Sequence, residues 1–154
     1  MPSFFALDIG EESRLGERSA VFHSAAKSIV IDHHEGESDI GDIIVRDPKN
    51  AAAACMVYEL IKELESLSGK VLLDKASAEA LYVGIVTDTG SFRYESAGKE
   101  CLKIAADLYD YGIDHADICS RIYSNFPLSQ LRLEARVLGN ARLIAGVAEH
   151  PCFE

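Results

Sequence analysis

Ser28-Ile29-Val30-Ile31-Asp32-His33-His34 joins a short apolar run directly to one carboxylate and two imidazoles. The apolar residues have the character of a buried strand, and neighbouring strand residues point to opposite faces of a sheet. Three polar side chains in a row therefore fit the end of a strand, and Glu35-Gly36 supplies turn residues directly afterwards. In an α/β sheet, ligands bind at the carboxyl ends of the strands. The stretch predicts a functional site at such an end. The alternative is a solvated loop that happens to hold two histidines.

The first half of the chain alternates strand and helix patterns around this stretch. Further buried strands are predicted at Ser3–Leu7 and Ile43–Val45, and a helical turn at Glu11–Gly16. Short buried strands that alternate with helices indicate a parallel sheet covered by helices. The predicted fold class is therefore α/β, with a parallel sheet flanked by helices and a helical second half.

Capping residues and breakers mark the predicted helices. Asn50 is expected to cap a helix that runs to Leu67 and ends before Gly69, and Asp74 to cap the next helix, through Val86. The remaining elements are predicted at Gly98–Tyr111, at Asp114–Tyr123, at Leu128–Leu143 after Pro127, and as an unpartnered strand at Ile144–Val147.

Two further acids end apolar segments. Asp8 closes Phe4-Phe5-Ala6-Leu7, where its alternative role is to cap the helical turn that follows. Asp88 ends an apolar helix, and the alternative there is an ordinary helix terminus with a glycine stop at Gly90. An acid at the negative end of a helix dipole is unfavourable unless a cation compensates. Carboxylates and imidazoles from separate elements suit a divalent cation, with Mn²⁺ and Mg²⁺ ahead of zinc when oxygen ligands dominate.

Composition narrows the class of protein. A chain of 154 residues with 48% hydrophobic content suits one globular domain. Its net charge of −10 argues against a protein that tracks along nucleic acid, which normally has a basic face. No apolar run is long enough for a membrane span, and the start lacks the basic region of a signal peptide, so a cytoplasmic protein without a membrane partner is expected.

The order of these motifs resembles the DHH family of phosphoesterases. The resemblance rests on Asp8, then Ile31-Asp32-His33-His34, then the run from Gly84 to Tyr94 (GIVTDTGSFRY), and it extends from Phe4 to Leu143. Arg14-Leu15-Gly16 and the Phe92-Arg93-Tyr94 ending are similar to the branch of nanoRNases and pAp phosphatases. This resemblance implies a metal-dependent hydrolase whose substrates are short oligonucleotides or adenosine 3',5'-bisphosphate.

The resemblance also implies the metal-binding residues. Asp8 matches an acid that bridges two metal ions, and His33 and Asp88 match ligands of one of them. The implied cofactor is Mn²⁺, although the ligand types also allow Mg²⁺. Two such ions would activate a water and neutralise charge on the phosphoryl oxygens.

Three more residues have implied roles. His34 matches the histidine that faces the scissile phosphate and helps to protonate the leaving oxygen. Asp32 is expected to orient a histidine and fix its tautomer. Arg93 is expected to contact a substrate phosphate, and the alternative is a surface salt bridge.

The sequence also departs from the family pattern. The family's first motif, His-x-x-x-Asp-x-Asp, is not found before Asp8. The domain prediction is therefore a DHH domain at 1–143 that lacks its first strand, followed by a linker or the start of a second domain at 144–154. Little or no hydrolysis by this chain alone is expected, and an exposed sheet edge favours a homo-oligomer.

The alternative functions are a fragment of a cyclic-di-nucleotide phosphodiesterase and a non-catalytic remnant that binds a metal or a nucleotide. A generic nucleotide-binding domain is disfavoured, because there is no G-x-G-x-x-G after a strand.

Overall fold

The computed structural model describes residues 3–36, 40–140, 142–144 and 147–149, which fall into two compact units that divide after Asp114. None of the described helices is long and apolar enough to cross a membrane.

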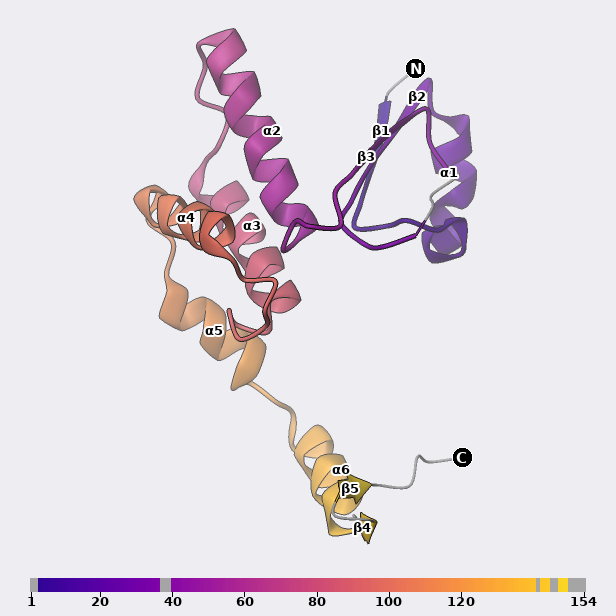
Figure 1. Ribbon diagram of the computed structural model, residues 1–154, viewed down its shortest axis with the longest axis vertical. Helices are drawn as coiled ribbons and strands as arrows, with labels where there is room; N and C mark the ends of the chain where they lie inside the picture. Colours follow the sequence, from indigo (N-terminus) through magenta and orange to yellow (C-terminus); the bar gives the residue numbers. More distant parts are fainter. Residues whose placement is uncertain (1–2, 37–39, 141, 145–146, 150–154) are drawn as a thin grey trace. The chain divides into compact units, whose positions relative to one another are not determined.

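The first unit contains a three-stranded parallel sheet (Figure 1). Its strands are β1 (Ser3–Leu7), β2 (Lys27–Asp32) and β3 (Ile43–Arg46), in that order across the sheet. All three strands form where the sequence predicts them. Because the strands are parallel, their carboxyl ends lie at one edge, where Leu7 pairs with Ile31 and Asp32 with Arg46.

One face of the sheet carries a small apolar core. It is covered by a 3₁₀ segment, η1 (Glu12–Arg18), that runs into the short helix α1 (Ser19–Ser24). Leu15 and Phe22 from these segments are buried against Ala6 and Val30 of the sheet. The predicted turn at Glu11–Gly16 therefore exists, and the helical backbone is interrupted at Gly16 (φ 54°, ψ −130°). A second helical segment then follows and runs into α1, which has no counterpart among the predicted elements.

The opposite face of the sheet is open along its two outer strands among the described residues, although Ile31 of the central strand is only 3% exposed. Phe5, Leu7, Ile43 and Val45 alternate with the core-facing positions, and each is 45–52% exposed. Apolar side chains gathered on one face in this way are typical of a surface that another segment or molecule covers.

Three α-helices complete the first unit. They are α2 (Ala53–Ser68), α3 (Lys75–Asp88) and α4 (Lys99–Leu108), and α4 runs into a short 3₁₀ turn, η2 (Tyr109–Tyr111). The three helices pack against one another, with Cys55, Ala78, Tyr82, Ile85 and Leu108 fully or almost fully buried. With the parallel sheet, this arrangement confirms the predicted α/β fold class.

The helix ends agree with most of the capping predictions. Asp74 caps α3 by accepting a hydrogen bond from the Ser77 backbone N–H (2.8 Å), and Gly69 ends α2 in the left-handed conformation. The prediction that Asn50 caps α2 is wrong: the cap position is Ala52, which makes no side-chain cap hydrogen bond. Asn50 lies three residues before the helix, and its backbone carbonyl lies 3.2 Å from Nδ1 of His33.

The second unit begins with α5 (His115–Tyr123) and α6 (Leu128–Gly139). The predicted last helix is too long at its C-terminus, because α6 ends at Gly139 and the chain then forms β4 (Arg142–Ile144). The predicted strand at Ile144–Val147 is also corrected: β4 pairs antiparallel with β5 (Val147–Glu149). Residues 145 and 146 lie outside the described residues.

Candidate metal centre

Asp8 lies immediately beyond the end of β1, at the carboxyl edge of the sheet. Its backbone N–H donates a hydrogen bond to the Ile31 carbonyl (2.9 Å), so the ladder between β1 and β2 extends to this residue. Its φ of 61° is in the left-handed region, which aspartate tolerates better than most residues with a Cβ. A residue held in this strained conformation at a strand end is typical of a functional site.

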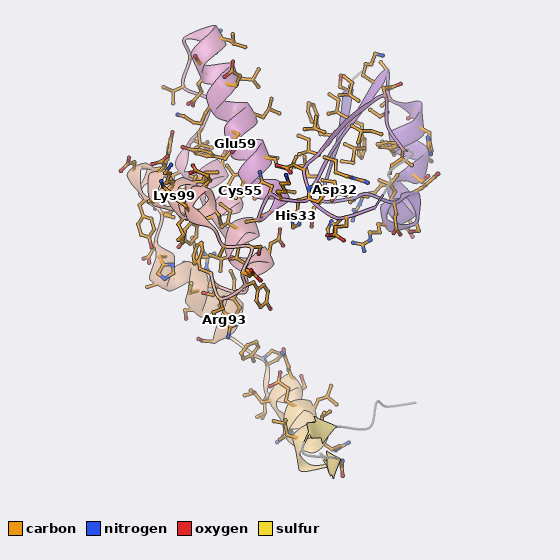
Figure 2. All side chains as sticks on the ribbon, viewed as in Figure 1. Asp32, His33, Cys55, Glu59, Arg93 and Lys99 are labelled. Carbon is orange, nitrogen blue, oxygen red and sulfur yellow. The ribbon has the colours of Figure 1, made fainter. Side chains whose placement is uncertain are left out.

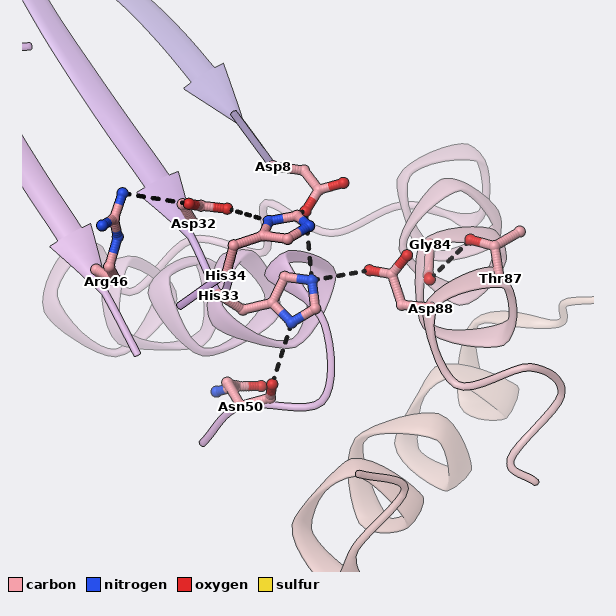
Figure 3. Close-up of polar contacts among 9 residues, drawn as sticks. All are labelled: Asp8, Asp32, His33, His34, Arg46, Asn50, Gly84, Thr87 and Asp88. Atoms are coloured by element: carbon pink, nitrogen blue, oxygen red, sulfur yellow. Dashed lines mark hydrogen bonds and ion pairs between the residues drawn. The ribbon is translucent and has the colours of Figure 1, made fainter. Parts of the chain in front are cut away.

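His33 lies just past β2 and turns its Nε2 toward two carboxylates. This nitrogen is 3.4 Å from Asp8 Oδ1 and 3.6 Å from Asp88 Oδ2 (Figure 3). On the other side of the ring, Nδ1 lies 3.2 Å from the backbone carbonyl of Asn50. A carbonyl can only accept, so Nδ1 carries the proton in the neutral ring and leaves the Nε2 lone pair free for a cation.

Asp88 is the last residue of α3, at the negative end of the helix. Burial raises the pKa of this carboxyl, and the negative charge of Asp8 raises it further. The charges of His33 and His34 act in the opposite direction and do not cancel the effect. Two carboxylates that repel each other around one imidazole nitrogen form an environment that a cation would stabilise.

The separations of His33 Nε2 from Asp8 Oδ1 (3.4 Å) and from Asp88 Oδ2 (3.6 Å) are close to those expected between two ligands of one divalent cation. Two ligands that each lie about 2.1 Å from the same metal are roughly 3.0–3.5 Å apart in octahedral or tetrahedral geometry. Ligand atoms of Asp8, His33 and His34 lie within 4.8 Å of one another, and Asp88 approaches the same His33 nitrogen. The donor set of two carboxylates and one imidazole suits Mn²⁺ or Mg²⁺ better than a soft metal.

His34 is held by a buried carboxylate. Its Nδ1 lies 2.7 Å from Asp32 Oδ1, and Asp32 is fully buried. Figure 3 shows Asp32 between His34 and Arg46, whose Nη2 is 3.4 Å from the other carboxylate oxygen. Burial tends to raise the pKa of Asp32, but hydrogen bonds from the His34 ring and backbone and the charges of His34 and Arg46 outweigh it and lower this pKa. Asp32 is therefore an anion that fixes the His34 tautomer, and the same Nδ1 lies 3.6 Å from Asp8 Oδ1 of the cluster.

Of the six residues predicted from the sequence, the structure brings five together and leaves one apart. Figure 2 shows Arg93 well away from Asp32 and His33. The Arg93 Nε donates a hydrogen bond to the Gly90 carbonyl (2.6 Å), which holds the loop that follows Asp88. The predicted phosphate contact of Arg93 stays a prediction.

Sequence reasoning missed two residues of this centre. Arg46 supports Asp32, and the Asn50 carbonyl orients His33. Arg46 directly follows the third predicted strand and ends the observed β3, so the rule that ligands lie at the carboxyl ends of strands could have found it. A backbone carbonyl has no signal in the sequence, and Asn50 could not have been found in this way.

Known proteins resemble this chain in sequence. It is 29% identical over 136 residues to the bifunctional oligoribonuclease and PAP phosphatase NrnA of Bacillus subtilis, covering 88% of this chain and 42% of that protein. It is 38% identical over 110 residues to the protein of the same name from Thermus thermophilus, covering 71% of this chain and 32% of that protein. The chain therefore spans less than half the length of these relatives.

A solved structure agrees in fold. The crystal structure of an exopolyphosphatase-related protein from Bacteroides fragilis matches with a TM-score of 0.81 at 31% identity, over 92% of this chain and 41% of that one. The family model that matches is that of the DHH family, N-terminal domain, over residues 3–85, more than half of the chain. The candidate centre, from Asp8 to the helix that ends at Asp88, begins within this match and ends just beyond it. The chain belongs to the DHH family.

Proposed function

We propose that this chain is the metal-binding module of a phosphoesterase that hydrolyses short oligonucleotides or adenosine 3',5'-bisphosphate. The observation that carries the proposal is that the Asp8 and Asp88 carboxylates both approach Nε2 of His33, with His34 in the same cluster as Asp8 and His33. The names of the relatives, oligoribonuclease and PAP phosphatase, support this substrate class.

The residues of the centre have different chemical roles in this proposal. A divalent cation held by Asp8, His33 and Asp88 supplies Lewis acidity toward a phosphoryl group and lowers the pKa of water nearby. His33 can hold it only through Nε2, because its Nδ1–H is engaged by the Asn50 carbonyl. His34 in its imidazolium form can donate a proton from Nε2 to the leaving oxygen, while Asp32 stabilises the positive ring through Nδ1.

Manganese is the proposed cofactor, with magnesium as the alternative. Both ions accept carboxylate oxygens, and manganese also accepts an imidazole readily. In the part of the chain that the structure describes, this centre gathers ligands for one cation. We therefore propose that this chain by itself hydrolyses its substrates slowly or not at all, and that further ligands come from outside the described residues.

The test is hydrolysis of a 5'-phosphorylated diadenylate and of adenosine 3',5'-bisphosphate, with and without Mn²⁺. Asp88→Ala is the inactive control, and Asp110→Ala, on the exposed turn η2, is the matched control. Slow Mn²⁺-dependent turnover that only Asp88→Ala removes would support the proposal. Cleavage of cyclic-di-AMP in preference to both substrates would favour the cyclic-di-nucleotide phosphodiesterase. Mn²⁺ binding with no turnover of any substrate would agree both with the need for further ligands and with the non-catalytic alternative, whereas rapid turnover by this chain alone would contradict the need for further ligands.

A further inference from the structure

A hollow of about 220 Å³ opens beside His34, at the carboxyl edge of the sheet. The loop after β1 and the start of η1 form one wall, with Gly10 and Arg14, and Arg46 at the end of β3 forms another. The walls meet closely at Gly10: a Cβ there would lie 2.5 Å from Asp32 Oδ2 and 2.9 Å from Arg46 Nη2. The hollow is therefore formed by residues of separate strands, with a fixed floor at Asp32.

Arg46 lines this hollow, and some of its N–H donors are not used in hydrogen bonds. Its guanidinium donates to the Gly36 carbonyl and to Asp32, and its side chain is 14% exposed. A guanidinium has five N–H donors, so these bonds leave several unused. Its Nε is buried and has no hydrogen-bond partner among the described residues. The two bonds hold the side chain in one orientation, so little conformational freedom would be lost on binding an anion.

Arg14 adds a second guanidinium. Its backbone is anchored, because its N–H donates to the Glu11 carbonyl (3.1 Å) and its neighbour Leu15 is buried in the core under the sheet. Its side chain has no hydrogen bond or ion pair with any other described residue. A fixed backbone with an unpaired guanidinium at the rim of a hollow suits the capture of an anion such as a phosphate.

Acidic residues also line the hollow. Asp32 is already paired with His34 and Arg46, so its charge is balanced within the floor. Glu11 and Glu35 are exposed, and Glu11 Oε2 accepts a hydrogen bond from the Ser13 hydroxyl (3.3 Å). Exposed carboxylates at the rim are solvated and screened, whereas the partly buried guanidinium of Arg46 is screened less.

We propose that this hollow binds a phosphate group of the substrate other than the one that is cleaved. His34 belongs both to the hollow and to the metal-binding cluster, so a phosphate in the hollow would lie beside a phosphate at the cluster. The substrates proposed above fit this arrangement, because adenosine 3',5'-bisphosphate and a short oligonucleotide with a 5'-phosphate both carry a second phosphate near the one that is cleaved. This inference rests on the proposed function and names the residues that would select these substrates, Arg14 and Arg46.

The experiment is calorimetric titration of the 154-residue chain, saturated with Mn²⁺, with adenosine 3',5'-bisphosphate and with adenosine 5'-monophosphate. We expect the bisphosphate to bind about tenfold or more tightly, the equivalent of one charge-assisted contact. Arg14→Gln should remove most of this preference, and Arg14→Lys should restore part of it. Arg18→Gln, an exposed arginine in the same η1 segment that does not line the hollow, is the matched control and should bind as the wild type does.

The outcomes separate this inference from the proposed function. Equal affinity for the two nucleotides in the wild type, or an unchanged preference in Arg14→Gln, overturns the phosphate subsite while the metal centre stands. Failure of the wild type to bind Mn²⁺ overturns both. Arg14 is exposed, so its variants should fold, and thermal unfolding of each variant checks this.

Discussion

His33 and His34 are each fixed through Nδ1, but by different partners. His33 contacts a backbone carbonyl and His34 a buried carboxylate, and the two rings are 4.8 Å apart between centroids. A carbonyl orients an imidazole without adding charge, whereas a carboxylate also favours its protonated form. Two adjacent histidines of the same stretch are therefore suited to different tasks, one to holding a cation and the other to transferring a proton.

Replacement of Asp32 by Asn tests the support of His34. The amide cannot carry the negative charge that Arg46 and His34 share, so a partly buried guanidinium loses its counter-ion. We expect the free energy of unfolding to fall by about 1–3 kcal/mol in urea denaturation. Asp110→Asn, at an exposed position, should change it by less than about 0.5 kcal/mol. Equal stabilities of the two variants would contradict the role of Asp32.

The raised pKa of Asp88 predicts how metal binding depends on pH. Burial and the charge of Asp8 favour the protonated form of this carboxyl, and a cation competes with that proton. Mn²⁺ affinity should therefore fall as the pH decreases, beginning above the range in which an ordinary aspartate titrates, and binding should release protons. Calorimetry in buffers of different ionisation enthalpy measures this release. In Asp88→Asn the affinity should be lower and its dependence on pH weaker; an unchanged pH profile would refute the assignment.

At the scale of elements, the segment after α3 positions Asp88 through an unusual backbone. Gly90, Ser91 and Phe92 all have φ between 54° and 61°, in the left-handed region. Thr89 is fully buried and its hydroxyl bridges the turn, donating to the Ile85 carbonyl (2.6 Å) and accepting from the Phe92 N–H (3.0 Å). The ring of Tyr94 packs over Gly90. The hydrogen bonds of Thr89 and the packing of Tyr94 therefore hold the C-terminal end of α3, where Asp88 lies.

Gly90→Ala should disrupt this turn more than an ordinary glycine substitution. A Cβ at Gly90 would lie 2.5–2.8 Å from the Tyr94 ring, in addition to the cost of a positive φ. Gly112 is the matched control, because its φ is 74° and a Cβ there would meet nothing within 4 Å. We expect Gly112→Ala to cost about 1 kcal/mol of stability and Gly90→Ala about 2–3 kcal/mol. Thermal unfolding compares them, and a smaller loss for Gly90→Ala would refute this packing argument.

Elements with a local signal could be predicted from the sequence. The strand Ser3–Leu7 and the cap at Asp74 depend on a few adjacent residues, and both form as predicted. Asn50 has the side chain of a cap, but its peptide group is needed to orient His33, and α2 begins at Ala53 instead. That competition arises between residues 17 positions apart in the sequence, and no local pattern contains it.

At the scale of the whole molecule, the predicted site residues could be found because they end separate elements. Asp8 follows β1, His33 follows β2, and Asp88 is the last residue of α3. The parallel topology brings the ends of the two strands to one edge of the sheet. Arg93 follows the same helix, but its side chain donates a hydrogen bond to the Gly90 carbonyl. The order of residues in the sequence could not predict this orientation of the side chain. The predicted self-association stays a prediction, as does the division at 143.

Manganese titration of the purified chain tests the central claim most directly, that Asp8, His33 and Asp88 bind one divalent cation. Electron paramagnetic resonance of free Mn²⁺ counts the bound ions, and we expect one ion at this centre. His33→Gln should weaken its binding at least about tenfold, because an essential ligand is removed. His23→Gln, a half-exposed histidine paired with Glu12, should leave it unchanged. If His33→Gln bound Mn²⁺ as tightly as the wild type, this centre would not be the metal site.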